Sequence, residues 1–282
     1  MENQALLVID IGNSTIASAI FYGDADDASG GGRQLPPPEL LEPLPTGTAL
    51  AAEDQTAIFR SFFESRLDNR GVRAAILSSV VPRLTESCLN AFEELLGKRP
   101  LLVNSGIYHF LPVKIPVSRA RQIGTDFVCN AVEAYLRFKR PCVITDFGTA
   151  LTFAAISPSG ELMGTAIAPG IAAASKALAD NAAQLYSVPF DIPPSPLGEN
   201  TVQAMQSGLI YGWAGLAESL VSRFKSEICC RTDARPQDIQ VIATGGFCDL
   251  IAPLAGITCM DRHLVLYGLR SIANLAARFF SF

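Results

Sequence analysis

One pattern occurs twice in this chain, and it constrains the fold more than any other feature. Its first copy runs from Leu7 to Ser14, and its second runs from Val143 to Ala150. In each copy an apolar run ends in Asp-x-Gly and a small polar residue, and a second apolar run follows. This spacing predicts a strand, a tight turn and a second strand. Because the Gly lets backbone approach a ligand and the Asp adds a fixed negative charge, two copies indicate two similar lobes that face one polyanion, such as a nucleotide.

Composition places the chain among compact globular proteins. It has 282 residues, of which 49% are hydrophobic and 17% are charged, enough for one large or two ordinary domains with an ample core. The net charge of −5 argues against a general nucleic-acid binder, which needs a basic stripe. Small anionic ligands remain compatible with an acidic chain, because backbone amides and single cations hold phosphates locally.

The sequence predicts a cytoplasmic protein with no membrane segment. It contains no uninterrupted apolar stretch of roughly 18 residues, and its first residues lack the basic region of a signal peptide. The seven cysteines are scattered, odd in number and without a CxxC pair, so free thiols in a reducing compartment are expected.

Strand and helix patterns alternate along the chain, which favours an α/β architecture with helices packed on mixed sheets. The repeat divides the chain into two lobes, residues 1–136 and 137–282, with a cleft between them. The Gly- and Pro-rich stretch from Gly23 to Thr48 is expected to be a surface loop. Helices are predicted over residues 56–67, 84–96, 127–138, 171–179, 202–224 and 264–280, and further strands over 74–81, 100–103, 162–167 and 239–243.

Three short segments carry candidate chemistry. Asp10-Ile11-Gly12-Asn13-Ser14 offers a carboxylate and polar groups in one loop, which suits a phosphate with Mg²⁺, although a plain hairpin turn uses Asp and Asn in the same way. Asp126, after Gly124 and Thr125, precedes a helix, where it is either a helix cap or a general base for an attacking alcohol. Thr244-Gly245-Gly246 follows a strand and would let backbone pass close to a flat ligand such as adenine.

Taken together, these segments resemble the type III pantothenate kinases of the acetate kinase/sugar kinase/Hsp70/actin superfamily. The resemblance implies two RNase-H-like (actin-like ATPase) lobes and ATP-dependent phosphorylation of pantothenate to 4'-phosphopantothenate, the first step of coenzyme A biosynthesis. It also implies Mg²⁺, a monovalent cation (K⁺ or NH₄⁺), and a homodimer with substrate sites at its interface, with no nucleic-acid or membrane partner. The matching strings occur in family order at Asp10–Ser14, Ser78–Pro82, Gly124–Asp126, Asp146–Ala150, Ala166–Gly170, Asn200-Thr201, Thr244–Gly246 and Gly268-Leu269.

The resemblance also implies residue roles. Asp126 is the implied base on the pantothenate hydroxyl, Asp146 would bind the monovalent cation, and Asp10 would bind Mg²⁺ directly or through water. The ATP-binding positions are Asp10, Ile11, Gly12, Asn13, Ser14, Thr15, Gly148, Thr149, Gly245 and Gly246. The substrate positions are Val117, Gly124, Thr125, Asp126, Phe127 and Thr201.

Two positions depart from the family pattern, and both lie on the substrate side. Phe127 stands where the family has Arg, and Val117 stands where it has Tyr. An Arg at position 127 would pair with the pantothenate carboxylate, and losing a contact of this kind costs about 2–5 kcal/mol. Ser14 in place of the usual Thr keeps the hydroxyl.

These departures leave other functions open. One is a nucleotide-binding paralogue with little kinase activity and a regulatory role, as in the relatives called Bvg accessory factors. Another is a kinase for a different small alcohol. A phosphatase of the same superfamily fits less well, because Asp126 and Thr201 stand where the kinase family has them.

Overall fold

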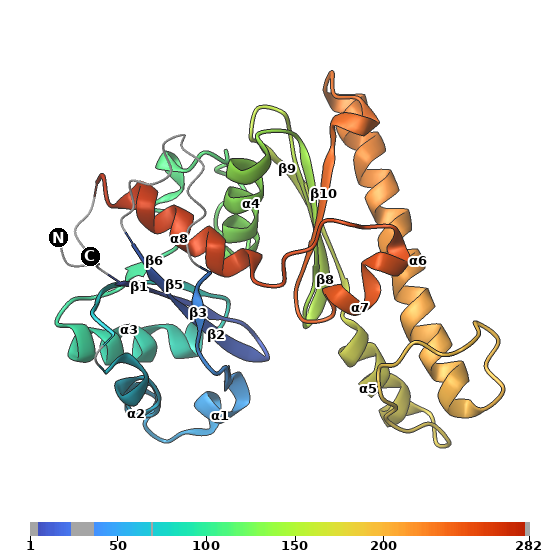
Figure 1. The fold of residues 1–282 in the computed structure, drawn as a ribbon, viewed down its shortest axis with the longest axis horizontal. Helices are drawn as coiled ribbons and strands as arrows, with labels where there is room; N and C mark the ends of the chain where they lie inside the picture. The colour runs from blue at the N-terminus through green and yellow to red at the C-terminus, as the bar shows by residue number, and fades with distance from the viewer. Residues whose placement is uncertain (1–4, 24–36, 69, 280–282) are drawn as a thin grey trace. The chain divides into compact units, whose positions relative to one another are not determined.

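The computed structural model describes residues 5–23, 37–68 and 70–279. The chain folds into two compact units, one of residues Met1–Glu133 with Val265–Phe282 and the other of residues Ala134–Leu264 (Figure 1). The sequence-based division, 1–136 and 137–282, differs from these units in the last helix, which belongs here to the first unit. The last helix packs closely on the first unit, because a Cβ atom at Gly268 of this helix would lie closer than 3.0 Å to the backbone of Cys129 in that unit.

The first unit is built on a mixed sheet with the strand order β3-β2-β1-β5-β6. The first Asp-x-Gly hairpin supplies its antiparallel pair, β1 and β2, and β5 and β6 extend it in parallel, while the short β4 pairs with β2. The strands span Ala5–Ile11 (β1), Thr15–Tyr22 (β2), Glu39–Leu40 (β3), Leu44–Pro45 (β4), Val72–Ser79 (β5) and Leu101–Leu102 (β6).

Helices cover both faces of this sheet, with α2 and α3 on one face and α8 on the other (Figure 1). Phe59 and Phe63 of α2 and Phe92 of α3 are fully buried in a core with β1. Gly97 ends α3 in the left-handed region (φ 69°), as the sequence predicts. The helices span Thr46–Ala51 (α1), Gln55–Leu67 (α2), Pro82–Leu96 (α3), Tyr108–Phe110 (η2), Thr125–Phe138 (α4, which runs into the second unit) and Leu264–Ala276 (α8, which starts at the last residue of that unit).

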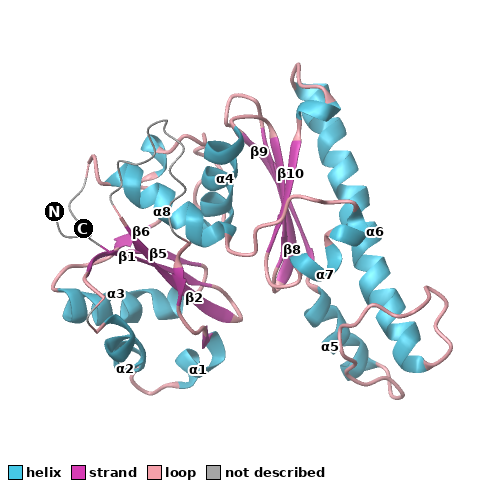
Figure 2. Cartoon of the chain, in the orientation of Figure 1, coloured by secondary structure: helices cyan, strands magenta, loops and turns pink. Residues whose placement is uncertain are grey.

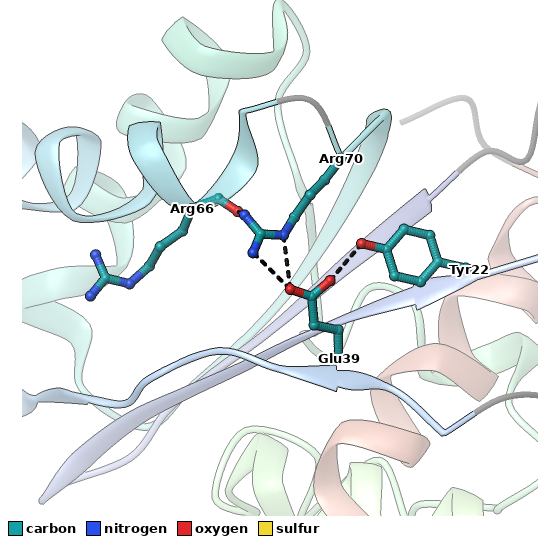
Figure 3. Close-up of polar contacts among 4 residues, drawn as sticks. All are labelled: Tyr22, Glu39, Arg66 and Arg70. Atoms are coloured by element: carbon teal, nitrogen blue, oxygen red, sulfur yellow. Dashed lines mark hydrogen bonds and ion pairs between the residues drawn. The ribbon is translucent and has the colours of Figure 1, made fainter.

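An ionic cluster fixes β3 to the rest of this unit (Figure 3). The Glu39 carboxylate accepts hydrogen bonds from Tyr22 Oη at 2.6 Å and from Arg70 Nη2 at 2.7 Å. Burial and the neighbouring Glu39 raise the pKa of Tyr22, and the hydrogen bond from Arg70 lowers the pKa of Glu39. Arg70 also donates to the carbonyl of Arg66 at the end of α2. The cluster therefore joins the end of β2, the start of β3 and the segment after α2.

The second unit repeats this arrangement. Its sheet has the order β10-β7-β8-β9, in which the second Asp-x-Gly hairpin forms β7 and β8, β9 is antiparallel to β8, and β10 is parallel to β7. Its long helix α6 begins after Asn200, whose side chain accepts a hydrogen bond from the Gln203 amide at 3.0 Å. The elements are Cys142–Phe147 (β7), Ala150–Ile156 (β8), Leu162–Pro169 (β9), Ile171–Asn181 (α5), Thr201–Arg231 (α6), Pro236–Asp238 (η3), Gln240–Thr244 (β10), Cys248–Ile251 (α7) and Pro253–Ala255 (η4).

The α/β class with mixed sheets flanked by helices, predicted from the sequence, is confirmed (Figure 2). The prediction of a loop from Gly23 to Thr48 is wrong for its second part, since β3, β4 and the start of α1 lie there. Those strands have two residues each, too few to show alternation, and their pairing with β2 is tertiary. Residues 24–36 lie outside the described part of the chain. No helix in the part that the structure describes has the length and apolar character needed to cross a membrane.

Candidate functional site

In the first unit, the Asp10 hairpin ends in a turn that is braced from one side. The Gly12 amide donates to the Thr15 carbonyl at 3.0 Å, which closes the turn. Thr46, the first residue of α1, donates its hydroxyl to the Gly12 carbonyl at 2.7 Å and its amide to the Ser14 carbonyl at 3.0 Å. Asn13 and Ser14 are exposed, so the turn is fixed against α1 and open on its other side.

Asp10 and Asp126 lie at the same end of the first sheet. Asp10 is paired in register with Ser78 of β5, next to the place where α4 begins. Burial raises the pKa of the Cys129 thiol, and the charges of Asp10 and Asp126 raise it further, so both carboxylates lie near this one buried residue of α4. The structure thus brings together the predicted phosphate loop and the predicted base.

Thr125 anchors the start of α4 to the end of β5. Its Oγ1 lies 2.9 Å from Ser78 Oγ and accepts from the Ser79 amide at 3.1 Å. The sequence assigns Thr125 to the substrate pocket, but its hydroxyl is engaged by β5. Ser78 and Ser79, which belong to the family pattern, therefore have a structural role, because they hold the helix that carries Asp126.

Asp126 is a largely buried carboxylate folded back over its own helix end. Its Oδ1 accepts from the Phe127 amide at 2.8 Å, and a Cβ atom at Gly124 would lie closer than 3.0 Å to this oxygen. Burial raises the pKa of Asp126 above its ordinary value, and the Phe127 amide offsets part of this rise. None of the described cations contributes to the shift. A carboxylate with a raised pKa is a better proton acceptor, which suits a general base.

The two positions that depart from the family pattern differ in their surroundings. Phe127 follows Asp126 on α4 and is half-buried, whereas Val117 is 92% exposed in the loop before α4. The structure therefore does not enclose Val117 in a pocket. Neither side chain offers a charge to an anionic substrate.

In the second unit, glycines bring backbone close to Asp146. Gly245 has φ +90°, a left-handed conformation, and a Cβ atom there would lie closer than 3.0 Å to Asp146 Oδ1. A Cβ atom at Gly170 would lie equally close to the carbonyl oxygens of Gly148 and Thr149. Carboxylate and carbonyl oxygens are hard donors, which fit an alkali or ammonium cation better than a soft metal.

Arg262 lies over the glycine loop that follows β10. Its guanidinium donates to the Gly246 carbonyl, and its Nη1 lies 3.8 Å from Asp249 Oδ2. Sequence reasoning missed Arg262 and Thr46, because both lie far along the chain from the loops that they hold and in segments without a pattern of their own.

Thr201 is the first residue of α6 and lines a groove of about 1030 Å³ between α5 and α6. The groove is mostly apolar, with Leu178, Met205 and Trp213 in its walls. Pro169 also lines it and is paired with Ala150, so the groove reaches the Asp146 turn. The Trp213 indole donates to the Pro169 carbonyl at 3.1 Å, which ties α6 to the end of β9.

Two α/β units, each with a mixed sheet that carries an Asp-x-Gly hairpin, define an α/β protein in which one sheet arrangement occurs twice. The chain belongs to the type III pantothenate kinase family, whose sequence model matches residues 6–223. It is 34% identical over 270 residues to a type III pantothenate kinase of Treponema pallidum, covering 96% of this chain and 94% of that protein. With a type III pantothenate kinase of Thermomicrobium roseum it shares 37% identity over 267 residues, 94% of this chain and 95% of the relative.

Among solved structures, a conserved putative Baf family transcriptional activator from Campylobacter jejuni matches with a TM-score of 0.50. That match covers 97% of this chain and all of the other at 15% identity, which supports the fold alone. The family resemblance drawn from the short motifs is confirmed.

Proposed function

We propose that this chain is a phosphotransferase that uses ATP to convert pantothenate into 4'-phosphopantothenate, the first step of coenzyme A biosynthesis. The observation that carries the proposal is Asp126, a largely buried carboxylate with a raised pKa near Asp10, in a member of the type III pantothenate kinase family. Family membership supplies the substrate, and the geometry supplies the candidate base.

In the proposed reaction, the Asp126 carboxylate accepts the proton of the pantothenate hydroxyl as its oxygen bonds to the γ-phosphorus of ATP. The bond from that phosphorus to the β,γ-bridging oxygen breaks, and ADP leaves. Such transfers depend mainly on positioning and charge stabilisation, so the fixed carboxylate and the braced turn are the features that matter. Gly124 contributes by leaving room for the carboxylate in this position.

The nucleotide is proposed to contact the glycine-containing turns of both units. The Gly12–Thr15 turn would hold phosphate oxygens, with Gly148 and Thr149 as further ATP contacts and Gly245-Gly246 beside the adenosine. Asp10 suits Mg²⁺, which would neutralise phosphate charge when bound. Asp146 with the Gly148 and Thr149 carbonyls would offer oxygen donors to K⁺ or NH₄⁺.

A homodimer is part of the proposal. Large apolar side chains at the groove between α5 and α6 are exposed, among them Leu178 at 40% and, next to the lining residue Gly198, Leu197 at 82%. An apolar area of this kind is typical of an interface between copies, and Thr201 at the groove would then lie at a substrate site beside the interface. Light scattering on the purified chain tests this, and a monomer at micromolar concentration would contradict it.

A cytoplasmic location stays a prediction from the sequence.

A second candidate function follows from Phe127. With no described cation acting on Asp126 and a phenyl ring at the next position, the site offers little to an anionic substrate. A kinase for an uncharged alcohol, or a nucleotide-binding accessory protein, fits that observation.

A coupled ADP-release assay separates these functions. We expect turnover with pantothenate, Mg-ATP and K⁺, and slower turnover when Na⁺ replaces K⁺. Turnover with pantothenol but not with pantothenate would favour the uncharged alcohol. Thermal stabilisation by Mg-ATP without turnover of either would favour the accessory protein, and no stabilisation at millimolar ATP would refute nucleotide binding.

A further inference from the structure

We propose that Thr46 is a positioning residue that holds the phosphate-binding turn in its ligand-ready shape before any nucleotide arrives. The identity of the ligand rests on the proposed function, whereas the bracing of the turn rests on the hydrogen bonds that Thr46 makes. Thr46 is completely buried, and it bonds the carbonyls of Gly12 and Ser14 through its hydroxyl and its amide. It thereby bridges the turn to α1 across 34 positions in the sequence.

The local fold explains why Thr46 reaches the turn. β4 pairs with the start of β2, with Leu44 opposite Ile16 and Pro45 opposite Thr15, and the next residue falls beside the turn. Thr46 is also the first residue of α1, and the first amides of a helix have no partner within it. Its amide is therefore available for the Ser14 carbonyl, and its hydroxyl for the Gly12 carbonyl.

These two bonds fix which way the turn presents its amides. The described peptide bonds are all trans, and in a planar trans peptide the C=O and N–H groups point in opposite directions. Because the Gly12 carbonyl points toward Thr46, the Asn13 amide points away from α1, on the open side of the turn. Amides presented in this way bind phosphate oxygens, and a turn that already has this shape loses less entropy when the ligand binds.

The second copy of the hairpin is held by contacts of another kind. Its turn is closed by the Gly148 amide, which donates to the Ala150 carbonyl at 3.2 Å, and it packs directly on the backbone of Gly170. A side-chain hydroxyl thus holds the first turn, whereas close backbone packing holds the second. Thr46 is therefore specific to the turn that is proposed to bind the phosphates.

The test compares Thr46→Val, which keeps the shape and removes the donor, with Thr46→Ser, which keeps the donor. Thr48→Val, at an exposed position of the same helix, is the matched control. We expect Thr46→Val to raise KM for ATP about tenfold, the factor that corresponds to one hydrogen bond of about 1.4 kcal/mol, and to change KM for pantothenate less than about twofold. Thr46→Ser and Thr48→Val should stay near the wild type.

A second measurement needs no ligand. Hydrogen exchange at the Gly12 amide should be faster in Thr46→Val than in the wild type, Thr46→Ser and Thr48→Val. Unchanged exchange, a rise in both KM values alike, or equal impairment of Thr46→Ser would overturn the positioning role. If Thr46→Val does not fold, Thr46→Cys replaces it, because a thiol is only a weak hydrogen-bond donor. Its KM for ATP and its exchange at the Gly12 amide should again exceed those of the wild type, Thr46→Ser and Thr48→Val. A wild type that Mg-ATP does not stabilise would instead refute the proposed function, while exchange still reports whether the brace exists.

Discussion

Gly124→Ala gives the most direct test of how Asp126 is placed. The new Cβ atom would lie closer than 3.0 Å to Asp126 Oδ1, a separation that real Cβ atoms do not adopt, so the carboxylate has to move. Moving it breaks the hydrogen bond that Oδ1 accepts from the Phe127 amide. The substitution therefore displaces the proposed base without removing any of its atoms.

Opposing effects keep the loss of stability in Gly124→Ala small compared with the loss of activity. A hydrogen bond to a charged group contributes about 1.5–3 kcal/mol. Burial opposes the charged form of Asp126, so part of that loss is recovered if the carboxylate moves toward water. Gly124 does not have a positive φ, and Ala at such a position stabilises by about 0.4–1 kcal/mol through the unfolded chain. We expect a net loss of about 1 kcal/mol in unfolding free energy, whereas a shift of about 1 Å in a catalytic group lowers kcat about a hundredfold.

The assay is ADP release under saturating ATP and pantothenate, with urea unfolding of the same samples. Gly164→Ala in β9 is the control, because a Cβ atom there meets only open space. In an Asp126→Asn background, Gly124→Ala should leave the residual rate unchanged, since the two substitutions act on one group. A kcat for Gly124→Ala within threefold of the wild type would refute this account of Gly124, and so would a further loss in the Asn background.

Three further predictions concern single side chains. Asp126→Asn should lower kcat about a thousandfold or more. The raised pKa of Asp126 means that the folded state holds its proton more tightly than the unfolded state does. The protonated Asp126 therefore stabilises the fold fully below the ordinary carboxyl pKa, and this stabilisation is lost as pH rises through the folded-state pKa. The Asn variant should therefore have a higher Tm than the wild type at pH 7 and no such advantage near pH 3; an equal or lower Tm at pH 7 argues against burial as the dominant cause. Phe127→Arg should lower KM for pantothenate about thirtyfold and leave KM for pantothenol unchanged, and an equal change for both substrates would exclude a contact with the carboxylate. Asp146→Asn should abolish the difference between K⁺ and Na⁺ in the assay, and a retained difference places the cation elsewhere.

The sequence predicts the parts of this fold that depend on local signals. Both hairpins follow from alternating apolar residues around Asp-x-Gly, and the end of α3 follows from Gly97. The spacing of Gly124 and Asp126 predicts a carboxylate at a helix start, where the structure has it. Backbone propensity and turn chemistry act within a few residues, which is why these features are visible in the chain.

Contacts between distant segments could not be predicted in this way. Thr46 lies in a Pro-rich stretch, and the pairing of β4 with β2, a contact between distant segments, brings it to the turn. Thr125 has the residue type of a substrate contact, but its hydroxyl is bonded by Ser78 and Ser79, which a sequence does not reveal. The end of α6 at Arg231, beyond the predicted residue 224, reflects packing of Ile228 in the core rather than a local stop signal.

The return of α8 to the first unit has a consequence for synthesis. Tyr267 packs edge-on against Phe21 with ring centroids 5.5 Å apart, Ser271 donates to Glu133 at 2.7 Å, and Gly268 lies against Cys129. A ribosome releases these α8 residues only after the whole of the second unit has been made. The first unit therefore stays incomplete, without α8, while the unit encoded later becomes complete before it. Nascent chains that end before residue 264 should be protected from protease in the second unit and cut in the first.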